Sequence, residues 1–181
     1  MRRLLTLALL PQIIGAFLFS QAPLSKEATL IEAVSSSEWL IEATGKYMSA
    51  EKKERKAKKD VTKNGIERAT DDAKKAAIYF ILFGGTDPMI SSTQERQKFD
   101  SHESFYFDMS NVGRYVSWEE SALQKKIKIS GGKGMKVVKR LKINKSILMK
   151  DLENHQILEA REDLADVLGN PFIMVIPVVK K

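Results

Sequence analysis

The part of the chain that most constrains its fold is residues 64–85, a segment that begins charged and ends almost wholly apolar. Its small and apolar residues recur at spacings of three, four and seven, so they lie on one side of a 3.6-residue helix. These residues are Ile66, Ala69, Ala73, Ala76, Ala77, Phe80 and Ile81. Asn64 suits the start of a helix, and Gly84-Gly85 suits its end in a left-handed conformation. We therefore predict a helix over residues 64–84 that packs closely across a sheet.

Two regions have the pattern of strands. Residues 38–48 alternate with a period of two, with Trp39, Ile41 and Ala43 on one face. Residues 123–130 and 135–143 predict a hairpin closed by the glycines in 131–134. In its second strand one face carries Met135, Val137, Leu141 and Ile143, the other carries Lys136, Arg140 and Lys142, and Val138 and Lys139 are exceptions. One face of the sheet should therefore be solvated and basic.

The C-terminal region combines two helix patterns with one strand pattern. A helix capped by Asn144 or Ser146 should run to residue 154, and a second helix should cover residues 159–168. After Asn170-Pro171 an apolar run of strand type extends to residue 179. Residues 170–181 are either the last strand of this domain or the first strand of a truncated second domain.

The remaining segments complete the predicted architecture. Residues 86–117 carry many aromatic side chains without a regular period, which predicts a packed excursion with short helices. It should bury the apolar end of the central helix, although a membrane or partner surface is the alternative. Residues 23–36 are a short lead-in with room for one helical turn. We predict an α/β (α+β) fold in one domain over residues 37–181, a two-layer sandwich of a small mixed sheet, the long helix across it and two shorter C-terminal helices.

The first 22 residues have the pattern of a secretory signal peptide. Arg2 and Arg3 precede an apolar centre, and a small-x-small cleavage pattern ends at Ala22. The chain has no cysteine, which excludes disulfides and a lipid anchor on cysteine. Its formal net charge of +7 is modestly basic and includes both arginines. We expect a periplasmic or outer-membrane-associated protein after cleavage.

No motif predicts a catalytic, cofactor or metal site. The glycines in 131–134 lack the spacing and the hydroxyl of a phosphate-binding loop, and no nucleophile-elbow motif occurs. The two histidines, His102 and His155, are far apart in sequence, and Asp100 and Glu103 do not complete a zinc site around the first. An envelope hydrolase, the third function class considered, would need a pocket near residues 100–103 with several converging polar groups.

A cationic run over residues 51–59 is the candidate binding feature. Polyanion binding would use Lys52, Lys53, Arg55, Lys56, Lys58 and Lys59, together with the basic face of the predicted sheet. A solvated helix or loop is the simpler interpretation of the same run. Its composition also allows the central helix to continue backward, with Gly65 as an interruption of about 1 kcal/mol.

One set of residues resembles a known family. The strand over residues 39–44 is followed by Gly45 and then by the helix with Ala69, Ala73, Ala76 and Ala77. This arrangement resembles the N-terminal domain of the flagellar assembly protein T family, and residues 76–89 and 163–177 are similar to related exported bacterial envelope proteins. The resemblance covers residues 37–179 and implies a sheet with an alanine-rich helix across it, an envelope location and no catalytic residues.

From these observations we expect a non-enzymatic assembly or protein–protein interaction module of the bacterial cell envelope. Its partners would be other envelope proteins or further copies of itself. The alternative is a binding module for an anionic polymer or membrane surface through the run at residues 52–59. The predicted export signal argues against nucleic acid as a partner.

Overall fold

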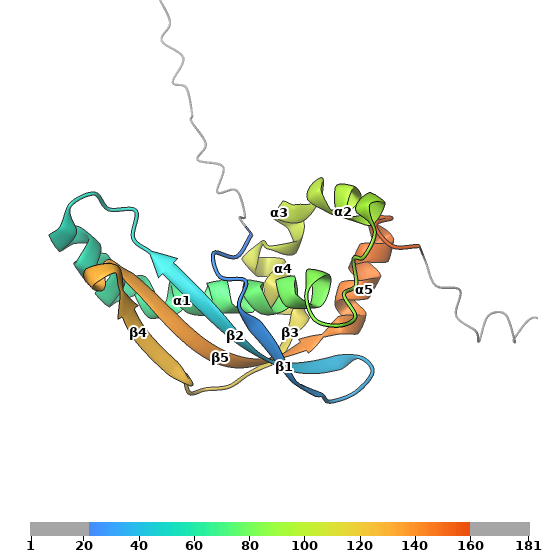
Figure 1. The fold of residues 1–181 in the computed structure, drawn as a ribbon, viewed down its shortest axis with the longest axis horizontal. Helices are drawn as coiled ribbons and strands as arrows, with labels where there is room; N and C mark the ends of the chain where they lie inside the picture. Colours follow the sequence, from blue (N-terminus) through green and yellow to red (C-terminus); the bar gives the residue numbers. More distant parts are fainter. Residues whose placement is uncertain (1–21, 160–181) are drawn as a thin grey trace, which may run out of the picture.

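The computed structural model describes residues 22–159, in which a five-stranded sheet is covered on one face by a long helix (Figure 1). The strands are β1 (Ala28–Ala33), β2 (Glu38–Met48), β3 (Val116–Glu119), β4 (Lys125–Ile129) and β5 (Gly134–Asn144). The helices are α1 (Glu54–Phe83), α2 (Thr93–Asp100), α3 (Glu103–Tyr106), α4 (Met109–Tyr115) and α5 (Lys145–Asn154), with a 3-10 turn, η1 (Ser130–Gly132). The predicted signal segment, the final strand and all but the first residue of the helix at 159–168 lie outside the described residues.

The predicted two-layer α+β class is confirmed, but the sheet is antiparallel rather than mixed. Its order is β1-β2-β5-β3, and β4 also pairs with β5. Helix α1 returns the chain across the sheet, so β3 and β4 run in the direction of β2. Strand β5 lies between β2 and these strands and is antiparallel to each of them. All pairs of neighbours in the described sheet are therefore antiparallel.

The alternation predicted for the two central strands is present and more regular than expected. Ile41 and Ala43 of β2 are fully buried, as are Val137, Leu141 and Ile143 of β5. Lys139, predicted to break the pattern, lies on this buried face and forms an ion pair with Glu119 of β3. Strand β5 keeps its period because a carboxylate from a neighbouring strand compensates the buried ammonium.

Helix α1 ends where predicted but begins ten residues earlier, at Glu54 rather than Asn64. Its first turns consist of good helix formers, and Ala57 and Val61 extend the buried stripe toward the N-terminus. Asn64 therefore lies inside the helix, where its side chain donates a hydrogen bond to Asp60. At the other end the helix stops at Gly84, and Gly85 has the predicted positive φ, 71°.

A glycine lets α1 approach the sheet closely. A Cβ atom on Gly45 of β2 would lie 1.8 Å from the carbonyl oxygen of Ala69 and 2.5 Å from the backbone nitrogen of Ala73. These alanines are fully buried. The helix backbone thus rests directly on the strand, as the small residues of the central segment predict.

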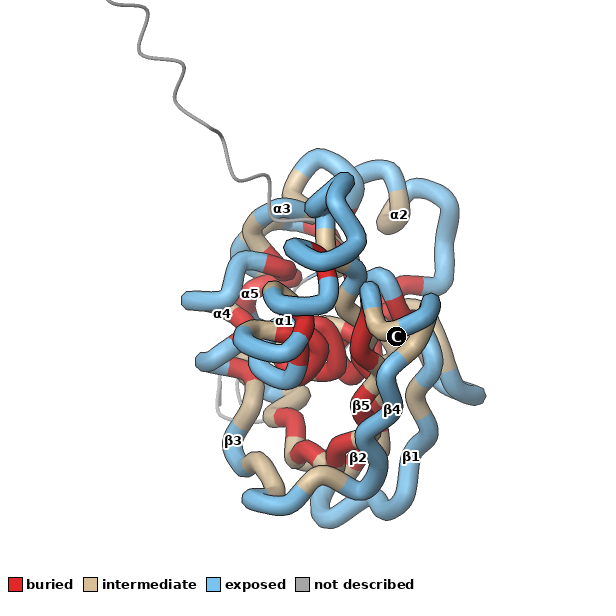
Figure 2. Tube along the Cα trace, turned by 90° about the vertical axis from the view of Figure 1, so that its left-hand side faces the viewer, coloured by how far each residue is buried: buried red, intermediate tan, exposed pale blue. Residues whose placement is uncertain are grey.

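The apolar end of α1 is buried by the aromatic excursion, as predicted. Phe99 of α2 packs edge-on against Phe83, with ring centroids 5.0 Å apart. Tyr106 of α3 stacks on Phe99 at 5.0 Å. Figure 2 shows the resulting core around α1 in red. Residues of this aromatic segment therefore cover the C-terminal end of α1.

Of three further predictions, two are confirmed and one is wrong in part. The glycine-closed hairpin is confirmed by antiparallel pairing of β4 with β5. Helix α5 is confirmed, and Asn144 caps it by accepting the N–H of Ile147 at 3.2 Å. The lead-in is wrong in part, because residues 28–33 form strand β1 on β2 rather than a helical turn. The ladder of β2 supplies hydrogen bonds that a single isolated turn lacks.

Candidate polyanion-binding site

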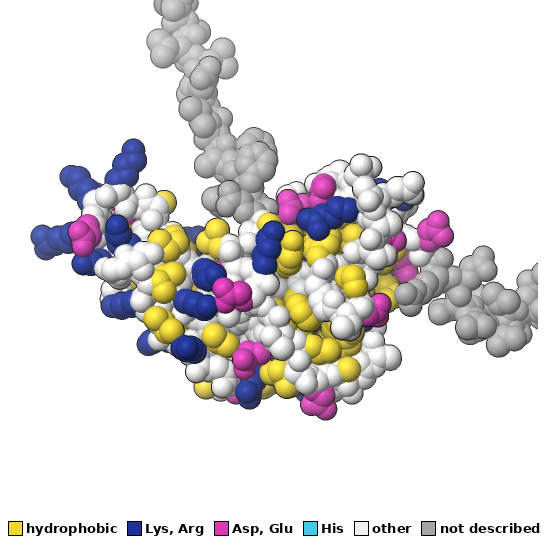
Figure 3. All heavy atoms as spheres, viewed as in Figure 1, with side chains coloured by type: hydrophobic (Ala, Val, Ile, Leu, Met, Phe, Trp, Pro, Cys, Tyr) yellow, Lys and Arg dark blue, Asp and Glu magenta, His cyan; other side chains and the backbone are white. Residues whose placement is uncertain are grey.

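Basic side chains gather at the end of the molecule where α1 begins, over the left of Figure 3. We define the cationic end as Lys52, Lys53, Arg55, Lys56, Lys58, Lys59, Lys63 and Lys133, all of which are exposed. The first six are the residues predicted from the sequence. The structure brings all six together because the connection after β2 leads directly into the first turns of α1.

The local fold explains why these cations face solvent. Ala57 and Val61 are the only buried residues in the first two turns of α1, and they fix one side of the helix against the sheet. The cationic residues of these turns, Arg55, Lys56, Lys58 and Lys59, fall on the remaining sides. Glu54 forms an ion pair with Lys58 at 2.7 Å, which suits the positive N-terminal end of the helix.

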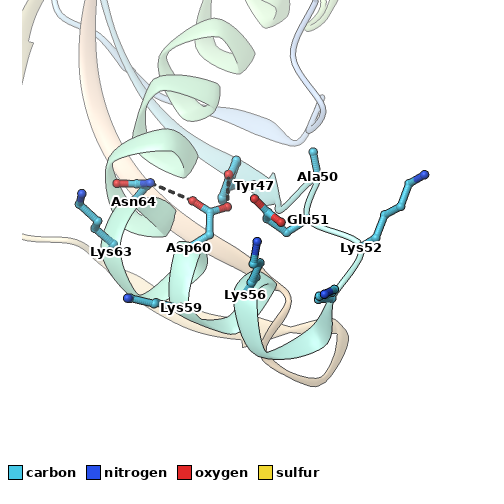
Figure 4. Close-up of a pocket in the computed structure, with 10 residues that line it drawn as sticks. Tyr47, Ala50, Glu51, Lys52, Lys56, Lys59, Asp60, Lys63 and Asn64 are labelled. Carbon is cyan, nitrogen blue, oxygen red and sulfur yellow. Dashed lines mark hydrogen bonds between the residues drawn. The ribbon is translucent and has the colours of Figure 1, made fainter.

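A broad hollow of about 820 Å³ lies between the end of β2 and this part of α1 (Figure 4). Lys56 and Glu51 point into it, whereas Lys52, Lys59 and Lys63 extend away from it. The hollow therefore contains carboxylates as well as an ammonium. The lysines that extend away from the hollow line its outer rim.

Asp60 holds the floor of the hollow in place. Its carboxylate accepts hydrogen bonds from the Tyr47 hydroxyl at 2.6 Å, the Ser49 hydroxyl at 2.6 Å and the Asn64 amide at 2.8 Å. These donors, led by Ser49, hold the pKa of Asp60 below its usual range, while burial and Asp60 raise the pKa of Tyr47. The ionised carboxylate thereby joins the end of β2 to the second turn of α1.

The turn between β4 and β5 adds to the same end, which the sequence analysis did not predict. The Lys58 side chain passes over Gly132, and Ser49 donates its N–H to the carbonyl of Lys133 at 3.0 Å. Lys133 thus joins a group of cations that lie seventy or more residues away in sequence. Only the packing of the hairpin beside α1, visible in Figure 1, brings them together.

The basic sheet face predicted to share this role differs from the cationic end, because its three predicted cations have partners within the protein. Lys136 forms an ion pair with Glu27 at 2.8 Å, and Arg140 forms one with Glu42 at 3.2 Å. Lys142 lies over the ring of Trp118, 5.8 Å from its centroid. These partners come from other strands and from the segment before β1, so β5 alone gave no sign of them.

The polar groups near residues 100–103 are engaged with local partners. Asp100 pairs with Arg96 at 3.3 Å, and the His102 ring nitrogen lies 2.9 Å from the Ser101 hydroxyl. The structure stacks His102 on His155, with ring centroids 4.7 Å apart, although the two are distant in sequence. Within residues 22–159 there is no group of three or more His, Asp or Glu side chains placed to hold a metal ion.

The geometry of the cationic end suits an extended anion better than a small one. A small anion inside the hollow would meet Glu51 and Asp60, while a chain or surface lying over the rim would meet the outward lysines. Such contacts are electrostatic and weaken with salt. They need no fixed pocket, because each ammonium moves on a flexible stem.

Comparison of the chain with known protein families, curated proteins and solved structures finds no match. The resemblance to the flagellar assembly protein T family therefore stays a prediction. Over the described range, no helix has the length and apolar character needed to cross a bilayer.

Proposed function

We propose that the protein binds an anionic polymer or an anionic membrane surface through the cationic end, without a catalytic step. The observation that supports this proposal is the arrangement of exposed lysines around the rim of the hollow, with its carboxylates inside. Asp60 is occupied by three hydrogen-bond donors, and Glu54 by Lys58. The other lysines of the rim remain available to a partner of opposite charge.

The strength expected of this contact follows from the number of lysines. Each basic side chain close to an anionic lipid surface contributes about 1 kcal/mol. Several of them together give micromolar binding at low salt. The interaction should weaken steeply as salt rises, because exposed charges are screened over about 10 Å at 0.1 M.

The test compares two double variants with the same change in net charge. Lys52→Gln with Lys56→Gln removes two cations from the cationic end, and Lys98→Gln with Lys150→Gln removes two exposed lysines from α2 and α5. The first pair should weaken binding roughly 30-fold, as expected for about 2 kcal/mol, and the second should change it little.

Two probes separate the possible sources of negative charge. Dextran sulfate represents a soluble polymer, and phosphatidylcholine vesicles with or without phosphatidylglycerol represent a membrane. Binding should be seen by sedimentation or fluorescence anisotropy at low salt and should fall at physiological salt. Absence of binding to both probes at low salt, or equal losses in the two double variants, would contradict the proposal.

A second candidate is the assembly role in the bacterial envelope expected from the sequence. It is supported by the signal-like N-terminal segment, by the family resemblance and by an unpaired sheet edge at β1. The proposal includes export and removal of residues 1–22. Intact-mass measurement of the protein from the periplasmic fraction checks this step, and a mass that retains residues 1–22 would count against it.

A further inference from the structure

Strand β1 forms one edge of the sheet and is exposed along nearly its whole length, as the pale blue tube in Figure 2 shows. Its side chains include Leu30, 38% exposed, and Ile31, 45% exposed. No described residue pairs with the strand on the side away from β2. The strand therefore presents an apolar edge with unpaired backbone groups.

The ladder shows which backbone groups are unpaired. Thr44 donates its N–H to the carbonyl of Glu27 at 2.8 Å, and Ala28 lies opposite Ala43. In an antiparallel pair, alternate residues turn both backbone groups toward the neighbouring strand. Thr29 thus faces β2, whereas Ala28 and Leu30 turn their N–H and C=O groups toward the free edge.

The opposite edge of the sheet consists of β3 and β4, and β4 is protected by charge, whereas β1 is interrupted only by a β-bulge between Leu30 and Glu32. Strand β4 has the sequence KKIKI, and its lysines prevent pairing with another strand. Strand β1, ATLIEA, has no lysine, arginine or proline. Edges of the β1 type are the ones that other strands extend by main-chain hydrogen bonding.

We infer that β1 is the interface through which two copies of this chain associate, by antiparallel pairing of β1 with β1 about a two-fold axis at Thr29. In this register Ala28 of each copy lies opposite Leu30 of the other. All the outward N–H and C=O groups of both residues are then paired. Two Thr29 side chains meet at the axis, a favourable cross-strand pair, and the half-exposed Leu30 side chains are covered.

Among the orientations that a second copy could take, charge repulsion favours this antiparallel one. Strand β1 runs away from the end of β2 that leads to the cationic end. Antiparallel pairing therefore places the two cationic ends at opposite poles of the dimer, where their repulsion is smallest. The dimer would also bind a long polyanion at two sites at once, which increases the overall affinity. This inference goes beyond the proposed polyanion binding and gives the assembly role a defined surface.

The length of the edge sets the expected strength. In this register only residues 28–30 of each β1 lie opposite β1 of the other copy, so the contact buries less than the roughly 1,200 Å² typical of stable complexes. We therefore expect reversible association with a dissociation constant on the order of 100 µM. Sedimentation velocity of the full chain from about 10 µM to about 1 mM should show a monomer–dimer equilibrium with little dependence on salt. A monomer throughout this range would overturn the inference.

Two variants at one position separate backbone pairing from side-chain contact. Leu30→Pro removes the outward N–H and leaves the hydrogen bonds to β2 intact, since proline is tolerated on edge strands in this orientation. It should weaken the dimer at least tenfold, because each dimer loses two hydrogen bonds. Leu30→Thr keeps the N–H and a strand-forming side chain, so its dimer should persist. Equal dimerisation of the two variants would place the interface elsewhere.

Amide hydrogen exchange of the unmodified protein tests the inference without a substitution. The N–H groups of Ala28 and Leu30 should gain protection as protein concentration rises, whereas Thr29, bonded to β2, should be protected at all concentrations. Protection of Ala28 and Leu30 that does not change with concentration would assign the edge to another part of the same chain and overturn the inference. Polyanion binding by a monomer would leave the proposed function standing.

Discussion

Asp72, midway along α1, accepts hydrogen bonds from three backbone N–H groups of two other segments. Those of Leu24 and Ser25 lie 2.7 and 3.0 Å from its carboxylate oxygens, and that of Lys46 lies 2.8 Å away. Burial raises the pKa of this carboxyl, while the three donors favour its charged form. The side chain therefore fixes both the segment before β1 and the end of β2 against the helix.

Glu27 makes a similar junction at the surface, and its effect should depend on pH. Lys136 and Lys46 lower its pKa to about 2 from an ordinary 4.5. A lowered carboxyl pKa stabilises the folded state above pH 4.5, and this stabilisation is lost as the pH falls toward about 2. The side chain is 54% exposed, so the contribution should be about 1 kcal/mol or less.

Replacing Glu27 by Gln should remove this acid-sensitive contribution. Urea unfolding at several pH values between 4.5 and about 2 should show a smaller loss of stability in the variant than in the unmodified protein. Above pH 4.5 the variant should be slightly the less stable of the two. Parallel pH profiles would mean that the two lysines do not stabilise the ionised side chain.

Lys139 illustrates what a single strand cannot reveal about its own residues. Its position in the period of β5 is an inward one, but a lysine there is expected to interrupt the pattern. Glu119, which pairs with it and with Lys74 of α1, lies twenty residues earlier on β3. The sequence contains both charges, yet only the alignment of β3 with β5 puts them together.

At the scale of elements, the closest junction is between α1 and β2 at Gly45. A Cβ at this position would overlap the Ala69 carbonyl, so Gly45→Ala forces the helix away from the strand. Overpacking of this kind costs about 1–3 kcal/mol and sometimes more. Thermal or urea unfolding should therefore show a marked loss of stability.

Gly113 in α4 provides the matched control for this substitution. A Cβ there would lie within 4 Å of no atom beyond its chain neighbours and the backbone of its own helix, and the residue is exposed. Gly113→Ala should leave stability unchanged or raise it by up to about 1 kcal/mol. Equal destabilisation by the two substitutions would contradict the close approach of α1 to β2.

Elements with a strong period were predictable, and those that depend on neighbours were not. The alternation in residues 38–48 gave β2 with its observed bounds, and the glycine turn gave the β4–β5 hairpin. Strand β1 was missed because its six residues show no clear alternation and gain their conformation from β2. The early start of α1 was underestimated because Asn64 resembles a cap, although the stripe continues through Ala57 and Val61.

At the scale of the whole molecule, the cationic end and the apolar edge formed by β1 lie at different ends of β2. The cationic end lies where α1 begins, whereas β1 covers the other half of β2, opposite residues 39–43. The six local cations were predictable because they fall within eight residues of the sequence, 52–59. Lys133 was not, because nothing in the sequence of the hairpin indicates that its turn lies beside α1.

The most direct test of polyanion binding measures all lysines of the protein at once. Each lysine is acetylated briefly with and without dextran sulfate, and its modification is quantified by mass spectrometry. Protection should be concentrated at Lys52, Lys53, Lys56, Lys58, Lys59, Lys63 and Lys133, while Lys98 and Lys150 should react as before. Uniform protection over the surface, or unchanged reactivity at the cationic end when the polymer is bound, would contradict the assignment of binding to this end.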